Sequence, residues 1–477
     1  MVTSKSLNRR LLDAQYAVRG PIVIRAQQLE EEGRKIIYCN IGNPQALKQK
    51  PLSFLRQTLS LLEYPELLDK PDVLKHYHQD VVEKVKKILE QHPHGTGAYT
   101  QSTGIPFIRQ AVADFIRQRD SIPTHRDRII LTDGASKGVQ AVLIALLKEA
   151  NDGFLIPIPQ YPLYSASLTL YGGRQIGYFL DEQNSWQLSE EILKKSISQA
   201  RKEGINPVGM VVINPGNPTG AVLSHDNIKM IIGFARQHNL SIIADEVYQE
   251  NVYDPRERFH SFARVMNELQ ENGVSLFSLH SVSKGFLGEC GHRGGYLELR
   301  SVPDDVVAQF VKLQSISLCA NVSGQLATYL MVSPPKPGDQ SYGEYVRERD
   351  DVLSSLKRKA EILGNGINQI EGMSVDIPQG AMYAFVRIVL PVGKDVDLSG
   401  MNSADRLAYD EKRDTEYCMQ LLEKTGICVV PGSGFGQLPG TLHFRTTFLP
   451  PQDEIEEVVM KLKKFHEEYT KAEAVAL

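Results

Sequence analysis

Short apolar runs alternate with stretches of helical spacing over much of this chain, from about Arg128 to Leu299. Most of the runs are bounded by glycine, proline or small polar residues, which is typical of buried strands. The strand candidates are residues 128–132, 154–156, 175–180, 208–213, 241–244, 274–279 and 295–299. Strands that alternate with helices predict a mostly parallel sheet covered by helices on both faces. We therefore expect an α/β fold for this part of the chain.

The pattern changes at residues 333–339, Ser-Pro-Pro-Lys-Pro-Gly-Asp, which indicate a boundary or an exposed turn. A charged helical segment follows, and an amphipathic helix closes the chain. The later strand candidates are residues 374–377, 382–388, 427–430 and 441–447. We predict a large domain over residues 71–332 and a smaller α+β domain over residues 333–477. Residues 1–70 lack strong sheet signals and are expected to pack on the small domain.

Composition argues against several classes of function. The formal net charge is -4 over 477 residues, so the chain lacks the basic excess that broad nucleic-acid binding needs. It has five cysteines, and none forms a Cys-x-x-Cys pair. Neither a disulfide framework nor a zinc site is indicated, so no metal is expected and a reducing compartment fits best.

No apolar run reaches the roughly 18 residues of a membrane span, so no membrane partner is expected. The amino terminus has basic residues but lacks the apolar segment of a signal peptide. Lys5, Arg9 and Arg10 suit a mitochondrial address, although acidic residues follow early. The cytoplasm is therefore the expected compartment, and the mitochondrial matrix stays open as an alternative.

One lysine stands out in the segment 281–286, Ser-Val-Ser-Lys-Gly-Phe, which closely follows the strand candidate 274–279. Open α/β sheets bind ligands just beyond the carboxyl ends of their strands. A desolvated amine on Lys284 can bond to an aldehyde there. Ser281 and Arg293 supply a hydroxyl and a planar cation suited to a phosphate. Together these features suggest pyridoxal phosphate, and a solvated lysine in a Ser/Gly turn is the alternative.

A carboxylate, Asp245, comes directly after the strand candidate 241–244. At a strand's carboxyl end it can face the ring nitrogen of such a cofactor and keep it protonated, which makes the ring an electron sink. Tyr248 lies three residues further on and can donate its hydroxyl to the phenolic oxygen of the cofactor. A helix-capping carboxylate and a core tyrosine explain the same two residues equally well.

Three further segments follow predicted strands. Asn217, in the rigid turn Asn-Pro-Gly-Asn-Pro-Thr-Gly of residues 214–220, can be held against a ring oxygen. Ala135 and Ser136 open a helix whose backbone N–H groups favour a phosphate. Tyr161 can stack on a flat ring. Ordinary turns and a packed tyrosine are the alternatives for each segment alone. Because all of these segments follow strands, we expect them to meet at one edge of the sheet.

The chain resembles the pyridoxal-phosphate-dependent aminotransferases of class I, which have fold type I, from about Tyr38 to Phe465. The segments that carry this resemblance are Gly-Ala-Tyr-Thr-Gln-Ser-Thr-Gly (97–104), Asp-Gly-Ala-Ser (133–136), Asn-Pro-Gly-Asn-Pro-Thr-Gly (214–220), Asp-Glu-Val-Tyr (245–248) and Ser-Val-Ser-Lys-Gly-Phe (281–286). Within the family, residues 16–22, 283–296 and 443–448 look most like those of alanine aminotransferases. The resemblance implies that the large domain binds the cofactor and that the protein is a homodimer.

The resemblance also implies a role for each site residue. Lys284 would carry the cofactor and move a proton between substrate and cofactor carbons. Arg445 would bind the substrate carboxylate through a bidentate pair, and Gly42 would let the backbone approach the substrate. The residues that would hold the cofactor are Asp245 at the ring nitrogen, Asn217 and Tyr248 at the ring oxygen, Tyr161 on the ring face, and Ala135, Ser136, Ser281, Arg293 and a neighbouring subunit's Tyr99 at the phosphate.

The expected reaction is amino transfer from L-alanine to 2-oxoglutarate, which gives pyruvate and L-glutamate. Use of glyoxylate or another amino donor stays open, as does a lyase reaction of the aminocyclopropane-carboxylate synthase type. For the distal carboxylate of glutamate, Arg19 is one candidate partner. A cofactor-binding module of a transcription regulator is disfavoured because the first 70 residues carry no basic recognition helix.

Overall fold

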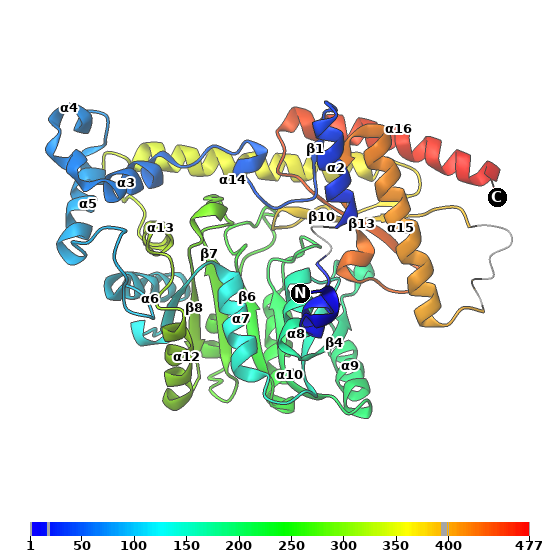
Figure 1. Ribbon diagram of the computed structural model, residues 1–477, viewed down its shortest axis with the longest axis horizontal. Helices are drawn as coiled ribbons and strands as arrows, with labels where there is room; N and C mark the ends of the chain where they lie inside the picture. Colours follow the sequence, from blue (N-terminus) through cyan, green and yellow to red (C-terminus); the bar gives the residue numbers. More distant parts are fainter. Residues whose placement is uncertain (1, 17–19, 393–397, 399, 477) are drawn as a thin grey trace.

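Two parts make up the structure, and each is built around its own sheet (Figure 1). The computed structural model describes residues 2–16, 20–392, 398 and 400–476. The larger part holds a seven-stranded sheet and occupies the lower half of Figure 1. The smaller part holds a four-stranded sheet and lies above it, beside the long helix α14 (Tyr342–Ile367).

The seven-stranded sheet is mostly parallel, which confirms the predicted α/β fold class. Its order is β2 (Ile129–Thr132), β8 (Gly295–Arg300), β7 (Leu276–Ser281), β6 (Ser241–Asp245), β5 (Asn206–Ile213), β3 (Asp152–Ile158) and β4 (Arg174–Phe179). Among these strands, β8 runs antiparallel to both of its neighbours, β2 and β7. The other pairs are parallel. The carboxyl ends of β2, β5, β6 and β7 therefore lie at one edge of the sheet.

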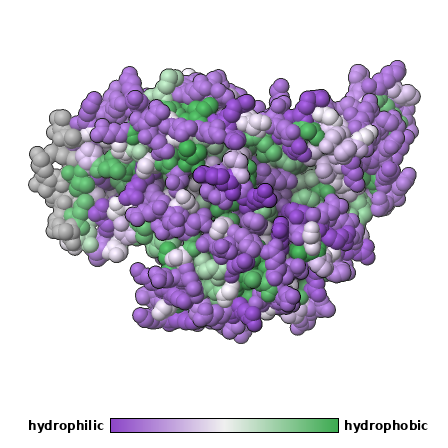
Figure 2. All heavy atoms as spheres, turned by 180° about the vertical axis from the view of Figure 1, so that it is seen from behind, coloured by the Kyte–Doolittle hydropathy of each residue, from purple (hydrophilic) through white to green (hydrophobic). Residues whose placement is uncertain are grey.

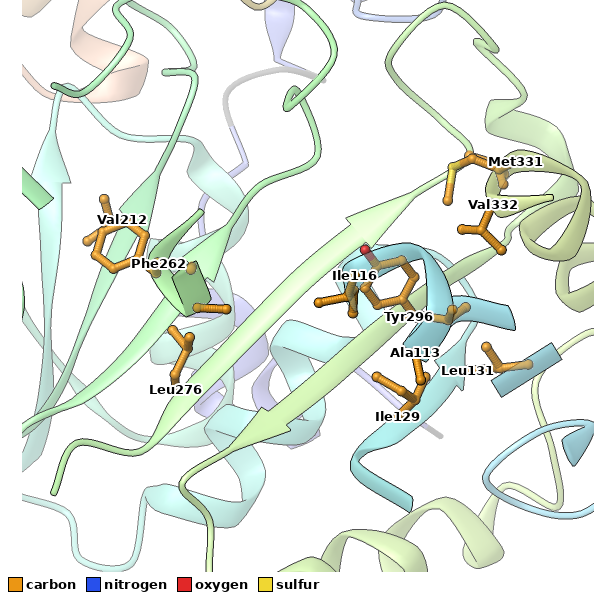
Figure 3. Packing of buried hydrophobic residues seen from close by; sticks show 14 of the residues in the cluster. Ala113, Ile116, Ile129, Leu131, Val212, Phe262, Leu276, Tyr296, Met331 and Val332 are labelled. Carbon is orange, nitrogen blue, oxygen red and sulfur yellow. The ribbon is translucent and has the colours of Figure 1, made fainter. Parts of the chain in front are cut away.

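Alternate residues of the central strands face opposite sides of the sheet, as the period of a strand requires. Val211, Ile243 and Phe277 pack in one core with residues of α7 (Ala135–Leu146), α8 (Pro162–Tyr171) and α12 (Asp304–Ile316). On the other face, Val212 and Leu276 belong to a second core, part of which is shown in Figure 3. The helices of that face are α6 (Pro106–Asp120), α9 (Glu190–Lys202), α10 (His225–His238), α11 (Phe262–Glu268) and α13 (Val322–Val332). Burial on both faces explains why these strands are almost continuously apolar.

Helix α10 illustrates how local sequence sets the ends of an element. The side chain of Ser224 accepts a hydrogen bond from the backbone N–H of Asn227 at 3.2 Å and so caps the first turn. At the other end, Asn239 adopts the left-handed conformation, with a φ of 54°, which ends the helix just before β6. The cap and the stop thus fix where the chain enters the next strand.

The smaller part is an α+β unit, as predicted. Its sheet is antiparallel, in the order β12 (Val430–Pro431), β13 (Leu442–Thr447), β10 (Tyr383–Ile388) and β9 (Met373–Ser374). Helices α15 (Ser403–Thr425) and α16 (Gln452–Ala476) complete it together with α14. The run 427–430 is not one strand, because β11 (Ile427–Cys428) pairs with β1 (Ile37–Tyr38) while Val430 pairs with Arg445. One apolar run therefore serves two sheets.

The first 70 residues contribute to both parts. Helix α2 (Pro21–Glu31) and β1 share the core of the smaller part, through Ile22 and Ile37. Helix α3 (Ser53–Glu63) shares a core of the larger part through Phe54, and it is followed by α4 (Pro71–Leu74) and α5 (Gln79–Gln91). The short helix α1 (Arg9–Asp13) lies beside α8, where Arg10 donates to the backbone carbonyl of Tyr171. The division of the chain at residues 70 and 332 remains a prediction.

The face of the molecule seen in Figure 2 is mostly hydrophilic, with hydrophobic residues in scattered patches. Within the described ranges, no helix is long and apolar enough to cross a membrane. Over the same ranges, no group of three or more His, Cys, Asp or Glu side chains is placed to hold a metal ion. All five cysteines are free thiols.

Candidate active site

Three of the predicted site residues follow neighbouring strands of the large sheet. Asp245 is the last residue of β6 and pairs in register with Ile213 at the end of β5 and with Leu279 near the end of β7. Asn217 lies in the turn after β5, and Lys284 lies in the turn after β7. The backbone register therefore brings these three side chains to one edge of the sheet, as the sequence predicted.

A cluster of donors lies at the amino-terminal end of α7. Arg293 donates from Nη2 to the Oγ of Ser136 at 3.1 Å and to the backbone carbonyl of Asp133 at 2.9 Å. Gly134, which precedes the helix at a φ of +74°, leaves room for the guanidinium, because a Cβ there would lie 2.6 Å from Arg293 Nη2. Ser281, at the end of β7, pairs with Gly295. A helix start, hydroxyls and a guanidinium together form a site suited to a phosphate.

Asp245 is buried and only half satisfied. Its Oδ2 accepts a hydrogen bond from the hydroxyl of Tyr164 at 2.7 Å, while its Oδ1 has no hydrogen-bond partner among the described residues. Burial raises the pKa of the Asp245 carboxyl, and the Tyr164 hydrogen bond, a backbone hydrogen bond from Val247 and the charge of Lys284 oppose that rise. A buried acceptor without a donor fits a protonated ring nitrogen of a bound cofactor.

The amine of Lys284 is held at the boundary between the two parts. Its Nζ donates to the backbone carbonyl of Gly42 at 2.6 Å and lies 5.8 Å from the ring centre of Tyr248. A Cβ on Gly42 would lie 1.7 Å from the hydroxyl oxygen of Tyr383, so only glycine fits between the amine and this tyrosine. The backbone of Gly42 is thus close enough to the lysine to form one wall of the site.

Arg445 is fully buried, at 1% exposure. Its Nη1 donates to the Oδ1 of Asn217 at 3.2 Å, and its Nη2 donates to the backbone carbonyl of Asn40. No carboxylate within the described residues forms an ion pair with it, and its Nε has no partner there. A buried guanidinium without an anionic partner is costly, so a carboxylate ligand is the natural group to compensate it.

Tyr161 precedes α8, and its hydroxyl forms a hydrogen bond of 2.9 Å with the hydroxyl of Tyr16. Burial raises the pKa of Tyr161 well above its usual value.

Tyr99 does not join the site of its own chain, because its side chain is 80% exposed. Its predicted reach into a neighbouring subunit stays a prediction. Arg19, the candidate for the distal carboxylate, lies outside the described residues.

The sequence did not reveal Tyr164, which bonds to Asp245, or Tyr383, which contacts Arg445. In the antiparallel pair of β10 and β13, Arg445 is opposite Phe385, so Tyr383 is its diagonal neighbour on the same face. The centre of the Tyr383 ring lies 4.2 Å from the guanidinium carbon. The period of two in the strand candidate 382–388 would have pointed to this residue, once the partner strand was known.

The residues at this edge fit pyridoxal phosphate at both of its ends. The donor cluster around Arg293 suits the phosphate, and the unpartnered Oδ1 of Asp245 suits the ring nitrogen. The Lys284 amine supplies the nucleophile between them. Fold and site together define a pyridoxal-phosphate-dependent enzyme of fold type I.

Comparison with known proteins identifies the family. Residues 71–462 match the family described as Aminotransferase class I and II. The chain belongs to this family, and within it the chain is most like the alanine aminotransferases. Its cofactor is accordingly pyridoxal 5'-phosphate.

Several relatives match almost the whole chain. A probable mitochondrial alanine aminotransferase of Dictyostelium discoideum is 49% identical, over 98% of this chain and 89% of its own length. Glutamate–glyoxylate aminotransferase 1 of Arabidopsis thaliana is 45% identical, over 97% of this chain and 95% of its own. An inactive alanine aminotransferase of Saccharomyces cerevisiae is 43% identical, over 98% of this chain and 94% of its own.

A solved structure supports the fold. The alanine aminotransferase from Pyrococcus furiosus superposes with a TM-score of 0.77 at 26% identity. The match covers 97% of this chain and 100% of that chain. The two proteins thus share their overall fold.

Proposed function

We propose that the protein transfers the amino group of L-alanine to 2-oxoglutarate, giving pyruvate and L-glutamate. The observation that carries this proposal is the buried guanidinium of Arg445, which has no carboxylate partner among the described residues. The ring of Tyr383 packs against this guanidinium, and the hydroxyl of the same tyrosine lies near the amine of Lys284. A buried cation beside a reactive amine suits an α-amino acid, whose carboxylate and α-carbon are adjacent. The relatives that are named alanine aminotransferases support the choice of amino donor.

The cofactor, when bound, supplies an electron sink for the negative charge that develops on the substrate's α-carbon. Asp245 would bind its ring nitrogen, and Asn217 and Tyr248 would contact its ring oxygen. Tyr161 would lie against the ring. The proposed phosphate ligands are Ala135, Ser136, Ser281, Arg293 and the partner subunit's Tyr99.

Two residues of this chain act on the substrate in the proposed reaction. Arg445 binds the α-carboxylate through its two terminal nitrogens and so fixes the orientation of the α-carbon. Lys284 accepts the α-proton at its Nζ and returns it later in the reaction. The carbonyl of Gly42, which accepts from the same Nζ at 2.6 Å, holds the amine near the substrate until it is needed.

A second candidate acceptor is glyoxylate, which the 45% identity to glutamate–glyoxylate aminotransferase 1 favours. Steady-state rates with alanine and glutamate as donors, each against 2-oxoglutarate and glyoxylate, distinguish the two. We expect alanine and 2-oxoglutarate to give pyruvate and glutamate in equal amounts. A lyase would form no glutamate from this pair, and absence of pyruvate with both acceptors would overturn the proposal.

The attachment of the cofactor is tested separately from turnover. Reduction of the holoenzyme with borohydride should fix the cofactor to one peptide, and mass spectrometry should map it to Lys284. Attachment at another lysine would contradict the assigned site even if the enzyme were active.

We also propose that the protein is a homodimer in which Tyr99 completes the partner's phosphate site. The exposure of large apolar side chains supports this arrangement, with Tyr99 at 80%, Ile316 at 78% and Leu318 at 52%. Sedimentation equilibrium should give twice the mass of the chain. A monomer with full activity would contradict the proposal.

For the compartment, we propose the cytoplasm, with the mitochondrial matrix as the alternative. Five free thiols suit either reducing compartment. The relatives named as mitochondrial favour the matrix. Fractionation of cells that express the chain with a carboxyl-terminal tag decides between the two.

A further inference from the structure

Tyr383 connects the two residues that handle the substrate in the proposed function. It opens β10 in the smaller part and is 3% exposed. Its ring contacts the guanidinium of Arg445, while its hydroxyl lies close enough to Lys284 for the charge of that amine to lower the tyrosine's pKa. The two ends of this side chain therefore reach two different groups of the site.

The ring of Tyr383 holds one side of Arg445. The guanidinium carbon lies 4.2 Å from the centre of this ring and 4.6 Å from the centre of the Phe435 ring. Because the guanidinium is buried and has no ion-pair partner among the described residues, contact with two aromatic rings stabilises its charge and limits its movement. The nitrogens that face a ligand are thereby kept in a fixed plane.

The hydroxyl of Tyr383 and the amine of Lys284 lie on either side of Gly42. A Cβ on Gly42 would be 1.7 Å from this hydroxyl oxygen and 3.0 Å from the lysine Nζ, so both atoms border the same position. Tyr248 donates a hydrogen bond to the Tyr383 oxygen, which orients the phenol group. The rings of the two tyrosines stand 6.2 Å apart and almost perpendicular, at 85°.

The charges around this hydroxyl lower its pKa. Burial raises the pKa of Tyr383, but the positive charges of Lys284 and Arg445 and the hydrogen bond from Tyr248 outweigh burial and bring this pKa below its ordinary value. The thiol of Cys290 acts in the same direction as burial. A polarised phenol oxygen beside an ammonium group is a strong acceptor for one of its protons.

We propose that Tyr383 is a positioning residue for amino transfer, whose ring holds Arg445 for the substrate carboxylate and whose hydroxyl holds the Lys284 amine beside the α-carbon. This inference rests on the proposed function, because it assigns the two ends of one side chain to its two steps, binding and proton transfer. Since the ring and the hydroxyl do different work, two substitutions separate them.

The first test removes the hydroxyl alone. In Tyr383→Phe, we expect kcat with alanine and 2-oxoglutarate to fall about 10- to 100-fold, because the amine is misplaced, while KM for alanine changes less than about twofold. Tyr417→Phe is the matched control, since it removes a buried hydroxyl that bonds to His466 in the same part of the chain. Its kinetics should equal those of the wild type. A wild-type kcat in Tyr383→Phe would overturn the role of the hydroxyl.

The second test removes the ring. Propionate has the carboxylate of alanine without its amine, so its binding to the holoenzyme reports on Arg445 and involves no reaction. We expect calorimetry to show about tenfold weaker propionate binding in Tyr383→Leu and nearly unchanged binding in Tyr383→Phe. Equal binding in all three proteins would overturn the role of the ring. If the leucine variant does not fold, loss of propionate binding in Tyr383→Phe contradicts the separation of the two roles.

A third measurement needs neither cofactor nor turnover. In the enzyme freed of cofactor, near-ultraviolet titration should show one tyrosine that ionises at lower pH than the others, and Tyr383→Phe should remove it. Persistence of that early ionisation in the variant would overturn the inference. Because the propionate and titration results do not depend on amino transfer, they remain decisive even if the wild type fails to convert alanine.

Discussion

The two walls of the active site are built in different ways. The cofactor wall comes from Asn217, Asp245 and Lys284, which follow adjacent strands of one sheet. The substrate wall comes from Gly42, Tyr383 and Arg445, which lie in three segments far apart in the chain. Register within one sheet places the residues of the first wall, whereas the second wall also needs packing between distant segments, since Gly42 lies outside the strand pair that holds Tyr383 and Arg445.

This difference predicts how each wall responds to change. A residue at a strand end keeps its place when its own side chain is altered, so substitution removes only its chemistry. A residue that is held by packing affects its neighbours when it changes size. We therefore expect substitutions at the first wall to remove one chemical group from the site, and substitutions at the second wall to displace neighbouring residues.

The largest effect should come from Lys284→Ala, which removes the reactive amine. Turnover of alanine and 2-oxoglutarate should fall by about 10³- to 10⁴-fold, because no other group takes the proton from the α-carbon. Unfolding temperature and sheet content should remain close to those of the wild type. Lys202→Ala, an exposed change on α9, is the control and should keep full activity. Full turnover in the Lys284 variant would show that the lysine has another role.

The next largest effect is expected from Arg445→Lys. A lysine keeps the positive charge but loses the planar pair of donors and the contact with two rings. KM for alanine should rise about 100-fold. Arg387→Lys, on the neighbouring strand, tests charge-preserving substitution at a half-exposed ion pair with Glu182 and should leave KM unchanged. A small effect at Arg445 would mean that packing does not fix this wall.

Gly42→Ala tests the same wall without removing any functional group. The added methyl would lie 1.7 Å from the Tyr383 hydroxyl, so one of the two must move. We expect kcat/KM to fall about tenfold or more. The control is Gly233→Ala in α10, where a Cβ meets nothing within 4 Å. If both variants keep wild-type kinetics, the close approach at Gly42 has no functional role.

The smallest effect concerns the pH dependence of folding stability, through Glu246, the residue after Asp245. Burial raises the pKa of Glu246 to about 7, although the charge of Arg119 opposes it. The protonated form is therefore favoured in the folded state. Its contribution to stability is complete below the unfolded pKa, near 4.3, and is lost as pH rises through about 7.

Glu246→Gln should remove this dependence. In the wild type, the backbone N–H of Phe262 and the hydroxyl of Ser278 each donate to one Glu246 oxygen. In the variant, the amide oxygen can accept from Phe262, and the amide nitrogen can donate to the Ser278 hydroxyl, which then acts as the acceptor. Chemical denaturation should show that the free energy of unfolding of the wild type falls by about 1–3 kcal/mol from pH 5 to pH 8. In the variant this fall should be smaller. Glu203→Gln, at an exposed position, should leave the wild-type pH dependence intact. If the free energy of unfolding changed equally with pH in all three proteins, the raised pKa of Glu246 would be contradicted.

The sequence predicts the residues of the cofactor wall better than those of the substrate wall. Asp245, Asn217 and Lys284 can be found from the sequence because each follows an apolar run within a few residues. Arg445 and Gly42 enter only through resemblance to a family, since neither stands in a distinctive local pattern. The run 427–430 shows the limit for the fold, because nothing in its spacing tells that it is divided between two sheets.

By itself, the sequence determined the alternation of strands and helices, and hence the sheet edge at which the cofactor residues gather. That information is local, because the period of an apolar run and the turn that follows it depend on neighbouring residues. Only the tertiary structure decided that Tyr383 lies between Arg445 and Lys284. That arrangement depends on the register of two antiparallel strands and on contact between the two parts, and packing between distant segments sets both.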